Sequence, residues 1–186
     1  MPWYILTGTP GAGKTAIVRQ LERDGLAVVE EAATDVIALE QAHGCAEPWE
    51  RASFTDAIAA LQRQRQRQLT APADRTVIFD RSPVCTLALC RYLGRPPSAG
   101  LMADVGRVVA GRAFEPEVFF VRSQGYVVPT AARRISQDDA MAFEVLHEQV
   151  YRELGFRLIE VPPGPLAGRA ALVRDTVTAL ATARTS

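Results

Sequence analysis

An eight-residue run near the N-terminus has the residue types and spacing of a phosphate-binding loop. Glycines let the backbone turn its N–H groups toward phosphate oxygens, and the first turn of a following helix adds unpaired N–H groups. A lysine in the seventh position reaches the β- and γ-phosphates, and the threonine after it ligates Mg²⁺. The pattern GxxxxGK[ST] therefore predicts binding of Mg²⁺-ATP by the run Gly8-Thr9-Pro10-Gly11-Ala12-Gly13-Lys14-Thr15.

Lys14 is the only lysine of the chain, because the other 20 of its 21 basic residues are arginine. This bias is most simply the codon composition of a GC-rich genome. Under such a bias, a retained lysine is expected where arginine would not serve. A compact ammonium suits the transferring phosphate better than the planar guanidinium fork, so Lys14 is a predicted catalytic residue.

An apolar strand at Thr76–Phe79 leads directly into Asp80 and Arg81. In an open α/β sheet, ligands bind at the carboxyl ends of the strands. Asp80 is therefore expected beside the phosphates, where it would hold Mg²⁺ directly or through water. Arg81 is a candidate clamp for a substrate or a phosphate, and the alternative is a surface arginine in a loop.

Two adjacent acids, Glu30 and Glu31, end the second expected strand at the same edge. Because two carboxylates are too costly to bury together without partners, one is expected to face solvent and the other the cleft. Glu31 is favoured as the group that orients an attacking hydroxyl or takes its proton. The sequence leaves open whether Glu31 or Asp80 is the base.

The segment 123–136 contains glycine, proline and two arginines with little periodicity, and it is predicted to be a mobile lid. Arg133 and Arg134 are expected to close over the transferring phosphoryl charge and exclude water. The alternative is a solvated pair beside a helix. Arg65 has two similar interpretations, of which a helix entering solvent is preferred over contact with an anionic substrate.

The remaining chemically capable side chains lack a functional spacing. His43 and His147 have no partner at ligand spacing, so both are interpreted as surface or core residues. Cys85 and Cys90 are interpreted as small apolar residues on a buried helix.

Apolar runs alternate with helical patterns along the whole chain, which predicts βαβ units and a parallel sheet. We expect one domain over residues 1–186, with five parallel strands and helices on both faces. Serine and proline at 82–83 mark a helix start, and Ser136 with Asp139 forms a second capping signal. The expected strands are Trp3–Thr7, Leu26–Val29, Thr76–Phe79, Glu117–Arg122 and Arg157–Val161. The expected helices are Lys14–Asp24, Ala32–Ala42, Glu50–Leu69, Pro83–Tyr92, Leu101–Ala110, one from Ser136, and Leu166–Ala181.

Composition excludes several classes of protein. The 21 basic and 21 acidic residues balance, unlike the basic excess of a nucleic-acid-binding protein. No apolar run reaches the roughly 18 residues of a membrane span. The three cysteines are odd in number and lack CxxC spacing, which favours neither a disulfide framework nor a zinc site. With no signal peptide, a cytoplasmic location is expected.

The ordered set of motifs resembles small P-loop kinase-like proteins grouped as an AAA-domain family of predicted ATPases, which are similar to nucleoside, nucleotide and nicotinamide riboside kinases. The resemblance implies an α/β P-loop NTPase fold of the nucleoside/nucleotide kinase type, with a five-stranded parallel sheet flanked by helices. It also implies an acceptor-side acid at Glu31, a metal-linked Asp80, lid arginines and a nucleotide-base contact over Pro162–Arg169, with Arg169 as a stacking or phosphate group. The segments that carry it are ILTGTPGAGKT, VVEEAATDVI, Pro48-Trp49, FDRS at Phe79–Ser82, YRELGFRLIEVPP and Arg169.

The chain departs from the family pattern at Thr34, Cys85, Leu89 and Thr130, all on the acceptor side.

The predicted function is transfer of the ATP γ-phosphoryl group to a small-molecule acceptor, which would be a nucleoside, a nucleotide or a related metabolite. One alternative is an ATP or GTP hydrolase that acts as a switch on a protein or lipid partner. Its GTP form is disfavoured because a single lysine leaves no NKxD motif. A nucleotide binder without turnover is the third hypothesis. The sequence leaves the oligomeric state open, with a homodimer as one outcome.

Overall fold

Five parallel strands form one sheet in the computed structural model, which describes residues 2–69, 75–110, 114–125 and 136–185. The strand order is β2-β3-β1-β4-β5. Helices cover both faces, so the central strands are continuous apolar runs, and every residue of β3 and β4 is buried. The strands are β1 (Trp3–Thr7), β2 (Ala27–Val29), β3 (Val77–Asp80), β4 (Glu117–Val121) and β5 (Arg157–Val161). The parallel α/β sheet expected from the sequence is confirmed.

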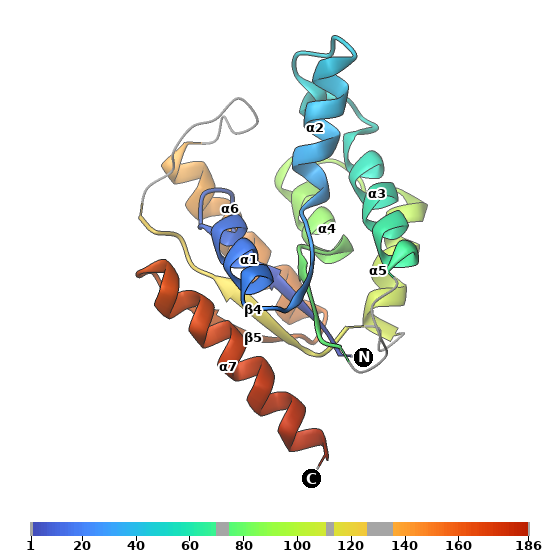
Figure 1. The fold of residues 1–186 in the computed structure, drawn as a ribbon. Helices are drawn as coiled ribbons and strands as arrows, with labels where there is room; N and C mark the ends of the chain where they lie inside the picture. The colour runs from blue at the N-terminus through green and yellow to red at the C-terminus, as the bar shows by residue number, and fades with distance from the viewer. Residues whose placement is uncertain (1, 70–74, 111–113, 126–135, 186) are drawn as a thin grey trace.

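Two layers of helices enclose the sheet (Figure 1). Helices α1 and α7 pack on one face over Tyr4, Leu6 and Phe119. Helices α4, α5 and α6 pack on the other face over Ile5 and Val118. The helices are α1 (Lys14–Arg23), α2 (Ala32–Ala42), α3 (Phe54–Gln68), α4 (Pro83–Tyr92), α5 (Ala99–Ala110), α6 (Gln137–Glu153) and α7 (Leu166–Thr185), with a short 3₁₀ turn η1 (Pro48–Glu50).

A third cluster of apolar side chains joins α2 to α3 beyond the carboxyl edge of the sheet (Figure 1). Val36 and Ile37 of α2 pack against Phe54 and Ile58 of α3. This helix pair stands beside the ends of β1 and β3, where the phosphate loop begins. It therefore supplies walls for a site at that edge.

Serine side chains start two helices as the sequence indicates. The Val84 N–H donates to Ser82 Oγ at 3.2 Å, and the Asp139 N–H donates to Ser136 Oγ at 3.1 Å. The helix predicted from Glu50 begins at Phe54 instead, because residues 48–50 form the separate turn η1. No helix in the described part of the chain is long and apolar enough to cross a membrane.

Candidate active site

The phosphate loop passes so close to β4 that only glycine fits at its first position. Gly8 has φ +134°, and a Cβ built there would lie 2.2 Å from the Val121 carbonyl oxygen. Gly13, with φ +87°, ends the loop and caps α1. Lys14 follows, is 5% exposed and donates from Nζ to the Thr9 carbonyl at 2.8 Å. The predicted loop residues are thus brought together around a buried ammonium.

Asp80 ends β3 next to this loop, paired in register with Leu6 of β1. Its side chain is buried, and its Oδ1 has no hydrogen-bond partner. Burial raises the pKa of Asp80 to about 6, against the attraction of the Lys14 ammonium. Thr15 is exposed in the first turn of α1 and borders the same cavity as Asp80. These two oxygen donors fit Mg²⁺, which takes one or two protein ligands and completes its shell with phosphates and water.

An ion pair joins the ends of two strands. Arg81 Nε donates to Glu31 Oε1, and Thr34 Oγ1 donates to Glu31 Oε2 at 3.1 Å. Burial opposes ionisation of Glu31, but the positive charges of Arg81 and Lys14 outweigh it and lower the pKa of Glu31 to about 2. Arg81 has φ +74°, a left-handed backbone rare outside glycine, and its N–H donates to the Leu6 carbonyl.

The adjacent acids divide only in part as expected: Glu30 is exposed and Glu31 pairs with Arg81, but both border the cavity. The Glu30 carbonyl accepts from Arg65 Nη1 at 2.7 Å, and Arg65 also pairs with Asp35. Arg65 therefore ties α3 to the start of α2. It neither enters solvent freely nor faces the site as the two sequence interpretations had it.

A buried polar cluster lies beneath the site, and no sequence motif indicated it. Thr7 Oγ1 contacts His147 Nε2 at 2.9 Å and Cys85 Sγ at 3.0 Å. The Tyr151 hydroxyl contacts Ser82 Oγ at 2.8 Å and Cys85 Sγ at 3.0 Å. Burial and the charges of Arg81 and Lys14 hold the pKa of His147 well below 6.5, so this histidine is neutral. The only available signal was the i,i+4 spacing of His147 and Tyr151 on α6.

The guanidinium of Arg169 lies behind the phosphate loop. Its Nη1 donates to the Ala12 carbonyl at 2.8 Å and its Nη2 to the Arg122 carbonyl at 3.0 Å. Its direct contact with a nucleotide stays a prediction. The two predicted lid arginines, Arg133 and Arg134, lie outside the described residues.

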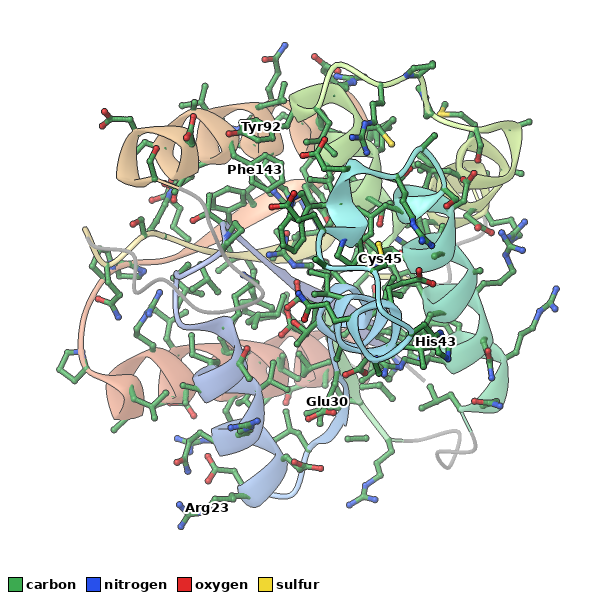
Figure 2. All side chains as sticks on the ribbon, turned by 90° about the horizontal axis from the view of Figure 1, so that it is seen from above. Arg23, Glu30, His43, Cys45, Tyr92 and Phe143 are labelled. Atoms are coloured by element: carbon green, nitrogen blue, oxygen red, sulfur yellow. The ribbon has the colours of Figure 1, made fainter. Side chains whose placement is uncertain are left out.

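One cavity of about 660 Å³ connects these groups. It is bordered by the phosphate loop, by Asp80 and by the Glu31–Arg81 pair. Its further walls come from η1, α2, α3, α4 and α6 and are largely aromatic or aliphatic. Their polar side chains include Asp35 and Asp139, and also Gln62 and Thr86, which bond to each other at 3.2 Å. Tyr92 and Phe143 lie side by side here, with ring centroids 5.0 Å apart (Figure 2). The apolar part of the wall includes Trp49, Phe54, Ile58, Leu89, Tyr92 and Phe143.

The same fold occurs in solved nucleoside and related kinases. Deoxyadenosine kinase from M. mycoides with bound dCTP is 16% identical with a TM-score of 0.62, and the match covers 96% of this chain and 100% of that one. The same kinase with products dCMP and a flexible dCDP is 14% identical with a TM-score of 0.60, over 96% and 99% of the two chains. NadR in complex with NR is 18% identical with a TM-score of 0.59, over 86% of this chain and 43% of that one. No curated protein sequence matches significantly.

The strand order and the glycine loop before α1 define a P-loop NTPase fold of the nucleoside-kinase type. A family model described as AAA domain matches residues 3–169. The chain belongs to this AAA-domain family, as the motifs in its sequence indicated.

Replacing Asp80 by asparagine is expected to stabilise the protein without ligand. A carboxyl whose pKa rises from 3.8 to about 6 on folding destabilises the fold above pH 6, and this penalty disappears below about pH 4. Asp80→Asn should therefore raise the free energy of unfolding at pH 7.5 by about 1–3 kcal/mol, since each pKa unit is worth about 1.4 kcal/mol. Thermal unfolding at pH 7.5 and pH 4 measures the difference.

The matched control has the opposite sign. Glu31→Gln removes a charge whose pKa is lowered on folding, so it should reduce stability at pH 7.5. A lower melting temperature for Asp80→Asn at pH 7.5 would contradict a destabilising effect of the buried Asp80 charge.

Proposed function

We propose that this chain is an ATP-dependent kinase that moves the γ-phosphoryl group of Mg²⁺-ATP to a hydroxyl or phosphate of a small molecule with a flat ring, namely a nucleoside, a nucleotide or a related metabolite. The observation that carries the proposal is the shared cavity. The phosphate loop, a carboxylate paired with arginine and an aromatic wall all border the same 660 Å³ space. A pure hydrolase needs no such second compartment, because its acceptor is water.

The fold is compatible with this assignment. The deoxyadenosine kinase from M. mycoides has been solved with dATP and dCTP, and NadR with NR. Aromatic rings hold flat ring systems by stacking and exclude water from them. We therefore place the ring of the acceptor against Trp49, Phe54, Tyr92 or Phe143, all of which border the cavity.

Lys14 would bind the β- and γ-phosphate oxygens in exchange for its bond to the Thr9 carbonyl. Its pKa is lowered to about 8 by burial and by Arg81, so at neutral pH it is still mostly charged. Thr15 and Asp80 would hold Mg²⁺, which when bound supplies charge neutralisation at the phosphates. Positioning and electrostatics thus account for most of the catalysis.

Glu31 would orient the acceptor hydroxyl and take its proton late, when bond formation to phosphorus has made that proton acidic. A carboxylate with a pKa of about 2 is a weak base, but it is ionised at every physiological pH and accepts a hydrogen bond from a hydroxyl. The hydroxyl oxygen attacks the γ-phosphorus, the bond to the β–γ bridging oxygen breaks, and the hydroxyl proton passes to Glu31 as the new bond forms. Arg81, which pairs with Glu31 and borders the cavity, would contact the transferring oxygens.

Lys14→Ala is expected to abolish Mg²⁺-ATP binding, because it removes the buried cation of the loop. Isothermal titration calorimetry measures this directly. Arg23→Ala removes an exposed cation from the last turn of the same helix and serves as the matched control with unchanged affinity. Equal affinities of wild type and Lys14→Ala would exclude the nucleotide site.

Label transfer tests the reaction itself. With γ-labelled ATP and a panel of nucleosides, nucleotides and related metabolites, we expect label on one acceptor class. Glu31→Gln should lower kcat by roughly 10²–10⁴-fold, the usual contribution of a positioned proton acceptor, while Mg²⁺-ATP affinity changes little. Phosphate release that no acceptor stimulates would point to the hydrolase or switch instead, and ATP binding with neither outcome to a binder without turnover.

A further inference from the structure

Arg169 is buried in the first turns of α7, with 4% of its surface exposed. Gly13 borders the cavity, whereas neither Ala12 nor Arg169 does. The guanidinium therefore stands on the far side of the phosphate loop from the cavity. Its two terminal nitrogens bond to main-chain carbonyls, one in the loop and one at the end of β4.

The carbonyl and the following N–H of a trans peptide point in opposite directions, because the peptide unit is planar. None of the described peptide bonds is cis. When Arg169 holds the Ala12 carbonyl behind the loop, it consequently turns the Gly13 N–H toward the opposite side. That side is the cavity, where an N–H can donate to a phosphate oxygen.

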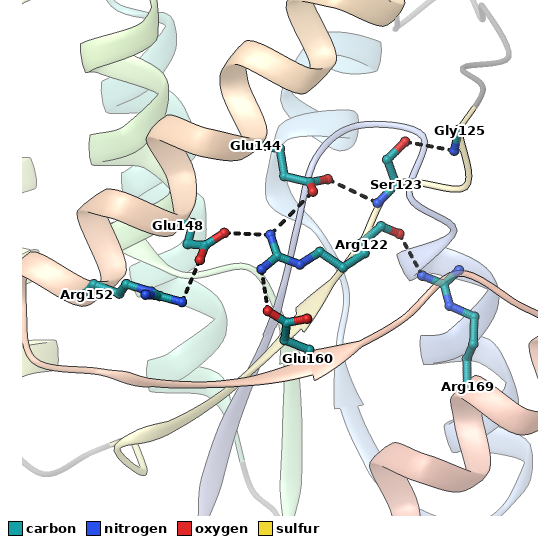
Figure 3. Close-up of polar contacts among 8 residues, drawn as sticks. All are labelled: Arg122, Ser123, Gly125, Glu144, Glu148, Arg152, Glu160 and Arg169. Atoms are coloured by element: carbon teal, nitrogen blue, oxygen red, sulfur yellow. Dashed lines mark hydrogen bonds and ion pairs between the residues drawn. The ribbon is translucent and has the colours of Figure 1, made fainter.

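The second peptide that Arg169 holds shows the same geometry with an anion in place (Figure 3). Arg169 Nη2 donates to the Arg122 carbonyl at 3.0 Å, and the next N–H, that of Ser123, donates to the carboxylate of Glu144 at 3.1 Å. The Glu144 oxygen thus occupies, at this peptide, the position that a phosphate oxygen would take at Gly13.

The Arg122 end of this arrangement is firmly held. The Arg122 side chain contacts Glu148 of α6 and Glu160 of β5, each at 2.6 Å (Figure 3). Its guanidinium carbon also lies 4.6 Å from the centre of the Phe120 ring. Because these contacts hold Arg122 in place at the end of β4, its carbonyl is a fixed hydrogen-bond acceptor for Arg169.

The spacing at Gly13 fits the same role. A Cβ at this residue would lie 3.0 Å from Arg169 Nη1, a tighter approach than real side chains normally make. The absence of a side chain at Gly13 therefore leaves room for the guanidinium as well as permitting the positive φ. The position of the Arg169 guanidinium thus requires a residue without a side chain at position 13 in the loop.

We infer that Arg169 is a positioning residue for the triphosphate: it orients the Ala12–Gly13 peptide so that the Gly13 N–H faces the phosphates, and it does not itself touch the nucleotide. This inference rests on the proposed binding of Mg²⁺-ATP. It replaces the stacking or phosphate contact that the sequence suggested with an action through the backbone.

Arg95 offers a matched control. It also donates to main-chain carbonyls, those of Trp49, Glu50 and Arg51, at 2.8 to 3.2 Å. Of these three residues only Trp49 borders the cavity, and none belongs to the phosphate loop. Arg95→Gln thus removes the same kind of contact without altering the loop.

The experiment compares wild type, Arg169→Gln, Arg169→Lys and Arg95→Gln by Mg²⁺-ATP calorimetry and thermal unfolding. Arg169→Gln should weaken Mg²⁺-ATP by roughly tenfold to a hundredfold, the usual effect of losing hydrogen bonds from a charged group. Arg169→Lys should restore part of the affinity, because an ammonium still donates to a carbonyl. Arg95→Gln should lower the melting temperature but leave Mg²⁺-ATP affinity unchanged.

A second readout reports on the loop without ligand. Because Lys14 is the only lysine, ¹⁵N-lysine labelling gives a single backbone amide signal, which adjoins the Gly13 peptide. This signal should shift in Arg169→Gln and Arg169→Lys and coincide with wild type in Arg95→Gln. An unshifted signal, or an Arg169→Gln affinity equal to that of Arg95→Gln, would overturn the inference alone. Failure of the wild type to bind Mg²⁺-ATP would overturn the proposed function and this inference with it.

Discussion

The site depends on compensation among four charged side chains, of which Lys14 and Asp80 are buried and Glu31 and Arg81 are partly buried. Lys14, Glu31 and the adjacent Asp80 and Arg81 come from three segments of the chain, yet a parallel sheet delivers all of them to one edge. Two cations and two carboxylates cancel, which makes their burial tolerable. The compensation is uneven: Arg81 takes Glu31 as its partner, and Asp80 keeps an oxygen without one. That unevenness leaves an Asp80 oxygen free of protein partners, as the proposed metal role of this residue requires.

Two of the residues that depart from the family pattern, Thr34 and Cys85, lie close to this charge cluster, whereas Thr130 lies outside the described residues. Thr34 donates to the second oxygen of Glu31, so it fixes the orientation of the carboxylate whose other oxygen Arg81 holds. Cys85 borders the cavity and also contacts Thr7 and Tyr151 beneath it. Changes of residue type at these positions alter the space and the hydrogen bonds that the cavity offers. The phosphate loop, by contrast, matches its pattern completely.

Much of the fold and the loop side of the site could be predicted from the sequence, because each carries a local signal. The apolar run of β3 predicts a buried strand, and its place before Asp80 and Arg81 brings both residues to the ligand edge. Contacts from a side chain to a distant carbonyl leave no such signal. Arg95 lies in no motif, and the resemblance that singles out Arg169 does not reveal its carbonyl partners; the partners of the two residues are 46 and 157 positions away. The polar cluster of Thr7, Cys85, His147 and Tyr151 corresponds to no sequence motif either, because its contacts join side chains from distant parts of the chain.

The single lysine also makes the phosphate loop the only substrate for a lysine-specific endoprotease. Lys14 is 5% exposed and lies between Gly13 and the first turn of α1, so a protease has no access to the flanking peptide bonds in the folded state. Every cut would consequently record an opening of this one loop and the start of its helix. The chain thus has a built-in reporter of local unfolding at its nucleotide site, independent of any reaction the protein performs.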